Sequence, residues 1–142
     1  MDVLSGATDA YEGKWEILTE ETKGFEEFSD AIGRPEENRT HVRNQVYVVE
    51  YKKDVNNVNV TVEMQGVSTP KTFSWTPGVE FNYVGLDRAN MKSTIRWDGN
   101  VCREDHASET GKWTAIRTVD GDSMTLTSEC NGVTMVEKFK RV

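Results

Sequence analysis

Apolar and polar residues alternate along the C-terminal stretch of the chain. Because successive side chains of a strand point to opposite faces of a sheet, Met135, Glu137 and Phe139 are predicted to share one face. Lys138 and Lys140 lie on the other face, which must therefore be the one in contact with water. The carboxyl group of Glu137 then points, with two apolar neighbours, toward the interior that the sheet encloses. Burying a carboxylate is costly unless it is paired or protonated, so we expect a partner for it inside the protein.

The N-terminal part of the chain combines one alternating stretch with a helical pattern. Residues 11–18 alternate as a first strand would, whereas the apolar positions of residues 25–32 follow the spacing of an amphipathic helix. Gly33 is a typical residue to end that helix, and Pro35 suits the first turn of a second one. A segment of two helices at about residues 24–43 is therefore predicted between the first strand and the rest of the chain.

The rest of the chain consists of short alternating runs separated by turn-forming dipeptides, a cadence typical of consecutive antiparallel hairpins. The turn signals are Asn56-Asn57, Pro77-Gly78, Asp98-Gly99, Asp120-Gly121 and Asn131-Gly132. The predicted strands are residues 46–49, 58–62, 72–75, 93–97, 113–116 and 124–127, with a further strand-like stretch around Cys102. So many strands with one helical interruption indicate a meander that closes on itself, since closure removes exposed edges. A barrel of this size can hold one small ligand.

Length and charge narrow the class of protein. A chain of 142 residues with 36% hydrophobic and 29% charged residues is expected to form one domain with a substantial core. The net charge of −7 argues against nucleic acid as a partner and against docking on anionic membranes by bulk charge. The small basic group of Arg34, Arg39 and Arg43 is diluted by neighbouring acids, and we interpret it as a solvated face. We expect a monomer.

Apolar runs and cysteines bear on the compartment of the protein. No apolar run approaches the roughly 18–20 residues that a membrane-spanning helix requires. The first ten residues lack the basic start and apolar middle of a signal peptide. A cytoplasmic protein is the simplest expectation, unless a leader was removed. Cys102 and Cys130 are too few for a disulfide framework, and free thiols are favoured over a single bridge in a reducing compartment.

Patterns that carry enzymatic chemistry are absent from the sequence. The chain has no Gly-x-Ser-x-Gly elbow, His-Glu-x-x-His helix or phosphate-binding loop. Its two histidines, His41 and His106, lie in different regions. The triplet Glu104-Asp105-His106 offers metal-ligand residue types, but consecutive residues of a strand diverge, so we interpret it as a solvated turn or sheet edge. We expect neither catalysis nor a bound metal or cofactor.

Three short segments occur in a characteristic order. They are Tyr11-x-Gly13-x-Trp15, the helix with Phe25, Phe28, Ala31 and Gly33, and Pro77-Gly78-Val79-Glu80-Phe81 followed by Asp87 and Met91-Lys92-Ser93-Thr94. Together they resemble the intracellular lipid-binding protein family, which includes the fatty-acid-binding and cellular retinoid-binding proteins, over a span from about Tyr11 to Val142. The resemblance implies a mainly β fold, a ten-stranded antiparallel up-and-down β-barrel of the calycin-like β-clam type with a helix-turn-helix lid. It makes residues 1–142 one lipid-binding domain, in which residues 1–10 are an N-terminal extension.

The resemblance also implies where the acid group of a ligand would be held, and here the chain departs from the pattern. Fatty-acid binders of this family place an arginine on one late strand and an Arg-x-Tyr pair on the last strand. Arg117 matches the first arginine, but Glu137 and Phe139 stand where the pair would be. A phenylalanine on the last strand is also found in the retinol-binding branch of the family, which this chain resembles in that respect. That branch uses an uncharged polar residue at the site, whereas Arg117 and Glu137 of this chain are charged. An incoming carboxylate would meet repulsion of roughly 1 to 4 kcal/mol from Glu137.

We hypothesise that Arg117 and Glu137 form an internal ion pair. Each charge would offset the desolvation of the other, and the pKa of Glu137 would be lowered. Such a pair could orient a neutral polar head such as an alcohol, an amide or a heterocycle. Two alternatives stay open: the pair serves only to fix strand register, or the barrel is packed around its own side chains and holds no ligand.

The predicted function is non-enzymatic binding and transport of a small hydrophobic ligand, such as a fatty acid, a retinoid or a similar lipid. The predicted ligand-binding residues are Arg117, Glu137, Phe139, Phe25, Phe28, Met135 and Leu126. The lid is the expected gate, and transient contact with a membrane through it stays open. The alternative is a hydrophilic protectant or interaction protein on the same fold, which the mean hydropathy of −0.64 also fits.

Overall fold

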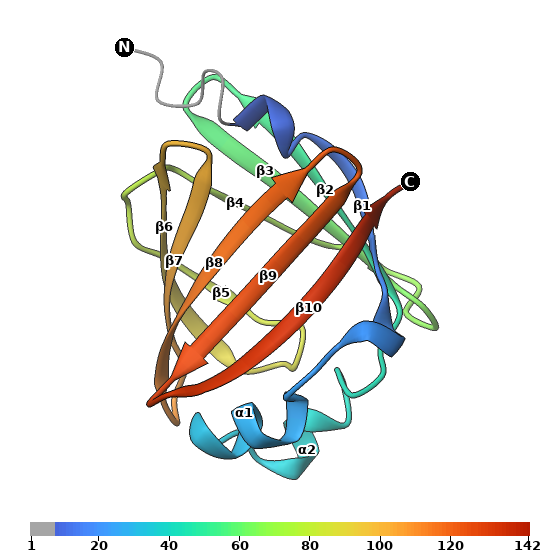
Figure 1. Cartoon of the computed structure of the whole chain (residues 1–142), viewed down its shortest axis with the longest axis vertical. Helices are drawn as coiled ribbons and strands as arrows, with labels where there is room; N and C mark the ends of the chain where they lie inside the picture. Colours follow the sequence, from blue (N-terminus) through green and yellow to red (C-terminus); the bar gives the residue numbers. More distant parts are fainter. Residues whose placement is uncertain (1–7) are drawn as a thin grey trace.

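A computed structural model describes residues 8–142, in which ten strands and two short α-helices are found (Figure 1). The strands are β1 Gly13–Ile17, β2 Tyr47–Asp54, β3 Asn57–Met64, β4 Lys71–Trp75, β5 Phe81–Val84, β6 Asn90–Asp98, β7 Val101–Ala107, β8 Lys112–Asp120, β9 Ser123–Cys130 and β10 Val133–Arg141. The helices are α1 Phe25–Ala31 and α2 Glu36–Arg39, and 3-10 turns at Thr8–Ala10 and Thr19–Glu21 flank β1. The first seven residues of the predicted N-terminal extension lie outside the described residues.

The strands form one sheet in the order β4-β3-β2-β1-β10-β9-β8-β7-β6-β5, and each neighbouring pair is antiparallel. The pairing of β1 with β10 joins the first strand to the last, so the sheet curves into a nearly closed barrel (Figure 1). The predicted ten-stranded antiparallel fold is confirmed. β4 and β5 lie at the two edges of this sheet and are not paired, so Pro77-Gly78, expected as a hairpin turn, instead connects the edge strands.

The hairpin of β9 and β10 decides which side chains face the barrel interior. Asn131 and Gly132 join the two strands with φ angles of 51° and 82°, the left-handed conformation that the favoured two-residue hairpin turn requires. The resulting register sets Leu126 opposite Glu137. Phe139, on the same face as Glu137, is only 2% exposed. The inward face predicted for the last strand is therefore correct.

The two helices form a lid over one end of the barrel (Figure 1). Phe28 and Ile32 are buried in a small cluster with Met135 of β10, which anchors α1 to the barrel. The predicted helices are correct in kind, although α2 ends at Arg39 and is shorter than expected. The β7–β8 loop lies close to the lid. A Cβ at Gly111 would be 2.6 Å from the carbonyl oxygen of Ile32, which is too close, so position 111 requires glycine.

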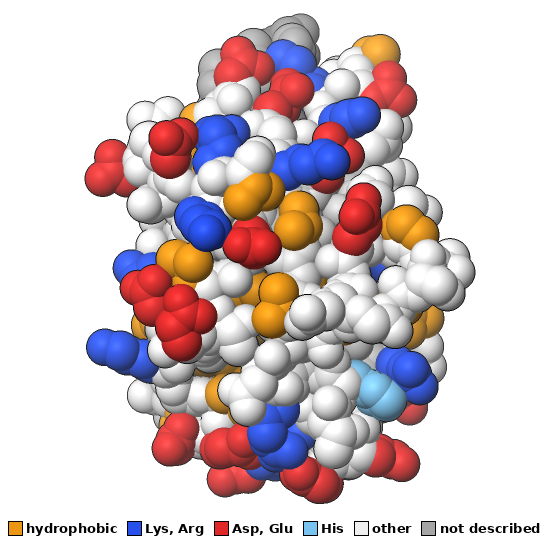
Figure 2. Space-filling view, turned by 90° about the vertical axis from the view of Figure 1, so that its right-hand side faces the viewer, with side chains coloured by type: hydrophobic (Ala, Val, Ile, Leu, Met, Phe, Trp, Pro, Cys, Tyr) orange, Lys and Arg blue, Asp and Glu red, His pale blue; other side chains and the backbone are white. Residues whose placement is uncertain are grey.

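The outer surface is mixed in charge. Figure 2 shows acidic and basic side chains interspersed on one face, with acidic ones gathered at the lower end, where Figure 1 places the helices. None of the helices described is both long and apolar enough to cross a membrane. Cys102 and Cys130 are both buried and free, as the favoured alternative predicted.

Candidate ligand cavity

A cavity of about 410 Å³ lies inside the barrel, within the volume range of sites that bind small molecules. The predicted ligand-binding residues all line it: Phe25, Phe28, Arg117, Leu126, Met135, Glu137 and Phe139. Much of the remaining wall is aliphatic or aromatic and includes Val49, Val60, Phe73, Trp75 and Trp97. The alternative of a barrel packed solid around its own side chains is therefore wrong.

Arg117 and Glu137 line the same cavity, but they lie two strands apart. Arg117 of β8 is opposite Leu126 of β9, and Leu126 is opposite Glu137 of β10. Since neighbouring strands are about 4.8 Å apart, roughly 10 Å of sheet separates the two charged residues. Glu104 of β7 is a diagonal neighbour of Arg117, because it lies opposite Ala115, and its Oε2 is 2.8 Å from Arg117 Nε. The ion pair predicted between Arg117 and Glu137 is therefore wrong, and Glu104 takes that place.

Glu104 belongs to a chain of polar side chains that crosses β5 to β8. Its Oε1 is 2.8 Å from His106 Nε2, and His106 Nδ1 is 2.6 Å from the hydroxyl oxygen of Ser93. The Tyr83 hydroxyl lies 3.0 Å from the same Ser93 oxygen. Because Glu104 is only 4% exposed, the interpretation of its sequence triplet as a solvated turn or edge is wrong. This row of hydrogen-bonded side chains has Arg117 at one end and Tyr83 at the other.

Both members of the Arg117–Glu104 pair remain charged. Burial alone would raise the pKa of Glu104, but the Arg117 guanidinium and the His106 ring hold that pKa well below its usual range. Burial alone would lower the pKa of Arg117, but Glu104 raises it well above its usual value. The positive charge on Arg117 is therefore offset before any ligand enters the cavity.

Sequence reasoning missed Glu104 and His106 although a signal was present. Cys102 lies in a stretch predicted to be a strand, and Glu104 and His106 follow it at every second position. Side chains two residues apart in a strand share a face, so all three face the interior. The serine, histidine and glutamate of this chain are residue types that can form a nucleophilic relay. Ser93, however, is 2% exposed and does not belong to the residues that line the cavity.

Glu137 lines the cavity without a partner for its carboxyl group among residues 8–142. Burial raises the pKa of Glu137, and the more distant guanidinium groups of Arg117 and Arg34 oppose only part of that effect. The lowered pKa predicted for Glu137 is therefore wrong, because the expected partner is engaged by Glu104. The result is an unpaired acid on the wall of an otherwise largely apolar cavity.

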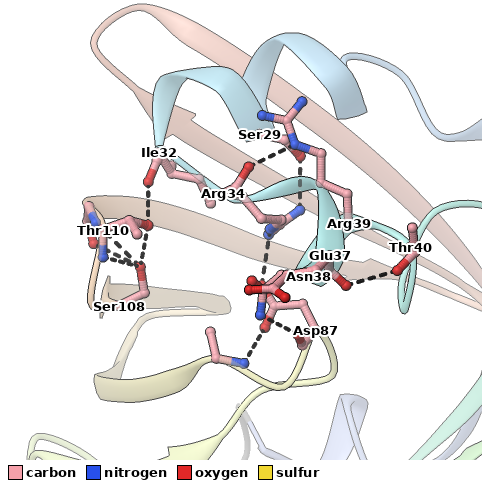
Figure 3. Close-up of polar contacts among 12 residues, drawn as sticks. Ser29, Ile32, Arg34, Glu37, Asn38, Arg39, Thr40, Asp87, Ser108 and Thr110 are labelled. Atoms are coloured by element: carbon pink, nitrogen blue, oxygen red, sulfur yellow. Dashed lines mark hydrogen bonds and ion pairs between the residues drawn. The ribbon is translucent and has the colours of Figure 1, made fainter.

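Two sets of contacts hold the lid on the barrel (Figure 3). Arg34, in the connection between α1 and α2, places Nε 3.0 Å from Oδ2 of Asp87 in the β5–β6 loop, and Asn38 Nδ2 donates to the Asp87 carbonyl at 2.9 Å. On the other side, the Thr110 hydroxyl donates to the carbonyl of Ile32 at 2.8 Å. The side chains of Arg34 and Asp87 are 11% and 12% exposed, so the interpretation of Arg34 as part of a solvated face is wrong.

Removing the charge of Asp87 is expected to loosen the lid. In Asp87→Asn, Arg34 loses the counter-ion that lies 3.0 Å from its Nε, and losing such a charged contact costs about 1.5 kcal/mol. We therefore expect roughly tenfold faster hydrogen–deuterium exchange across α1 and α2. Asp122→Asn is the matched control, since it removes the exposed partner of Arg141, and it should leave exchange in the lid unchanged. Equal exchange in wild type and Asp87→Asn would contradict a latching role.

Comparison with known proteins places the fold. No family model matches the chain. The fatty acid binding protein of Schistosoma mansoni, in complex with arachidonic acid, superposes with a TM-score of 0.84 at 21% identity, covering 96% of this chain and 99% of that one. Fatty-acid-binding protein 1 of Echinococcus granulosus gives 0.82 at 18% identity, with 94% and 98% covered. Secretory abundant heat soluble protein 4 of Ramazzottius varieornatus gives 0.82 at 21% identity, with 94% and 95% covered.

The chain therefore has the fold of the fatty-acid-binding proteins, a ten-stranded β-barrel with a lid of two helices. The fold that the resemblance of the sequence implied is confirmed.

Proposed function

We propose that the protein binds a small hydrophobic ligand in its cavity and carries it through water without catalysing a reaction. The observation that carries this proposal is the cavity itself, about 410 Å³ in volume, largely apolar in its wall and covered at one end by the lid. Burying apolar ligand surface there is favourable by about 25 cal/mol per Å². The likeness to the Schistosoma mansoni protein, whose structure holds arachidonic acid, supports a lipid as the class of ligand. Fatty acids, retinoids and similar lipids belong to this class.

The polar groups of the wall favour a neutral head over a carboxylate. Arg117 has five N–H donors and Glu104 accepts from one of them, so others can donate to a ligand oxygen. Glu104 already offsets the charge of Arg117, and Glu137 repels an anion from the far side of Leu126. An alcohol or an amide can accept a hydrogen bond from Arg117 or donate one to Glu137, according to which of them its head lies beside. A carboxylate can only accept, so it cannot form a hydrogen bond with the carboxylate of Glu137.

Competition between palmitate and hexadecanol for a fluorescent apolar probe tests this head-group preference. The two molecules have the same chain length and differ at the head. We expect hexadecanol to displace the probe at roughly tenfold lower concentration, which corresponds to about 1.4 kcal/mol and lies within the range of the expected repulsion. A strong preference for palmitate that Arg117→Ala abolishes would show that Arg117 holds carboxylates and would overturn the neutral-head preference.

A protectant that needs no ligand is the second candidate function. The mean hydropathy of −0.64 and the likeness to a protein named for its heat solubility support it. Native mass spectrometry of the purified protein, followed by extraction and identification of co-purifying lipid, separates the two. A carrier is expected to retain a lipid or to bind an apolar probe. Failure to bind any apolar probe would favour the protectant.

A further inference from the structure

The charged residues of the cavity wall do not all find partners. Four cationic residues line it, namely Arg34, Arg43, Lys71 and Arg117, together with four acids, Glu26, Asp87, Glu104 and Glu137. Three ion pairs join Arg34 to Asp87, Arg43 to Glu26 and Arg117 to Glu104. Within the part of the chain that the structure describes, Lys71 and Glu137 are left over.

Lys71 forms no ion pair with Glu137 and is not among the charged groups that shift its pKa. It is the first residue of β4, an edge strand, and four strand spacings separate β4 from β10. The ionisable groups that face Glu137 from neighbouring elements are Arg117 of β8, Glu104 of β7, Arg34 of the lid connection and the neutral hydroxyl of Tyr47 on β2. Both of these arginines are held by their own acids, at 2.8 Å and 3.0 Å. The charge on Glu137 is therefore the one that a ligand can complement.

We propose that Glu137 anchors a protonated amine, so that the cavity takes long-chain aliphatic amines in addition to neutral lipids. The inference rests on the proposed binding of hydrophobic ligands in this cavity and names a ligand class for it. An ammonium group supplies three N–H donors and the positive charge that Glu137 lacks, while the alkyl chain occupies the apolar wall. A charge-assisted hydrogen bond is roughly twice as strong as a neutral one, so an amine should bind more tightly than the alcohol of equal chain length.

Hexadecylamine and hexadecanol, competing for the same fluorescent apolar probe near neutral pH, test this inference. Salt at about 0.15 M limits attraction between the amine and the acidic outer surface, since charges are then screened over about 8 Å. We expect hexadecylamine to displace the probe at roughly tenfold lower concentration than hexadecanol. Glu137→Gln keeps the size of the side chain and should bring this ratio to about one, whereas Glu137→Asp keeps the charge and should retain a preference for the amine. Glu63→Gln removes the same charge from an exposed position of β3 and should leave the ratio unchanged.

Three results would overturn the inference. A ratio near one in the wild type would show that Glu137 does not distinguish the two heads. An unchanged preference in Glu137→Gln, with an unfolding curve like that of the wild type, would place the amine elsewhere. In both of these cases hexadecanol still displaces the probe, so only the amine inference fails. If neither displaces the probe, the proposed binding of hydrophobic ligands fails with it.

Discussion

Replacing Arg117 with methionine is expected to lower the free energy of unfolding by about 3–5 kcal/mol. Glu104, at 4% exposure, would remain in the interior without its counter-ion, and the hydrogen bond from His106 would not compensate the lost charge. The apolar volume of methionine roughly replaces the stem of arginine, so the expected cost comes from the unpaired carboxylate. Urea unfolding followed by tryptophan fluorescence measures this change as a shift in midpoint at constant slope.

A double variant tests whether the unpaired charge causes the loss. In Arg117→Met/Glu104→Gln both charges are gone, while the glutamine oxygen can still accept a hydrogen bond from His106, so we expect recovery to within about 1–2 kcal/mol of the wild type. Arg96→Met is the matched control, because it removes one partner of the exposed Arg96–Asp105 pair and should cost less than about 1 kcal/mol. A double variant as unstable as the single one would contradict this account.

Lowering the pH should reduce the difference in free energy of unfolding between wild type and Arg117→Met. In the wild type the pKa of Glu104 is lowered by folding, so its stabilising contribution is complete above the unfolded pKa of about 4.3 and is lost as pH falls through the folded pKa. In the variant, burial without Arg117 should raise the pKa of Glu104 above its unfolded value. The variant should therefore gain stability as pH falls and Glu104 takes up a proton.

Patterns of local sequence were sufficient for most of the fold. The alternation of the last stretch placed Glu137 and Phe139 on the inward face, and Asn131-Gly132 predicted the turn that fixes their register. Strand β5 was not among the predicted strands, because Phe81–Val84 has only four residues and follows a Pro-Gly turn that does not close a hairpin. Its place at an edge of the sheet depends on pairing with β6, which is a tertiary property.

The polar part of the cavity was only half predictable. Arg117 and Glu137 were correctly expected to face the same interior, because side chains alternate between the two faces of a sheet along each strand. Which charges pair depends on distance across the sheet, and the adjacent Glu104 is closer to Arg117 than an acid two strands away. Glu104 lies two residues after Cys102 in the same strand, so alternation also turns its side chain to the interior. In the triplet Glu104-Asp105-His106 the first and third side chains share one face, and only Asp105 points away from them.

Reversing the charge at position 137 is expected to reverse the head-group preference of the cavity. In Glu137→Arg, the affinity for palmitate relative to hexadecanol should rise about 100-fold, or about 2.7 kcal/mol. Two unit charges about 4 Å apart interact by about 4 kcal/mol at an effective dielectric constant of 20, and the variant replaces a repulsion with an attraction. Desolvation of the carboxylate cancels part of this gain, which is why the expected change is smaller than the sum of both effects. The probe-displacement ratio of the two ligands measures it.

Three companion variants separate charge from other causes in this result. Glu137→Gln removes the repulsion without adding an attraction, so its ratio should lie between those of wild type and Glu137→Arg. Adding Phe139→Tyr completes the Arg-x-Tyr pair of the fatty-acid binders and should favour palmitate by a further fivefold or so, since one hydrogen bond contributes about 1 kcal/mol. Glu63→Arg makes the same charge change on the exposed face of β3 and should leave the ratio as it is. An unchanged ratio in a folded Glu137→Arg protein would mean that ligand heads lie elsewhere, because a charge reversal beside the head cannot be neutral toward an anion.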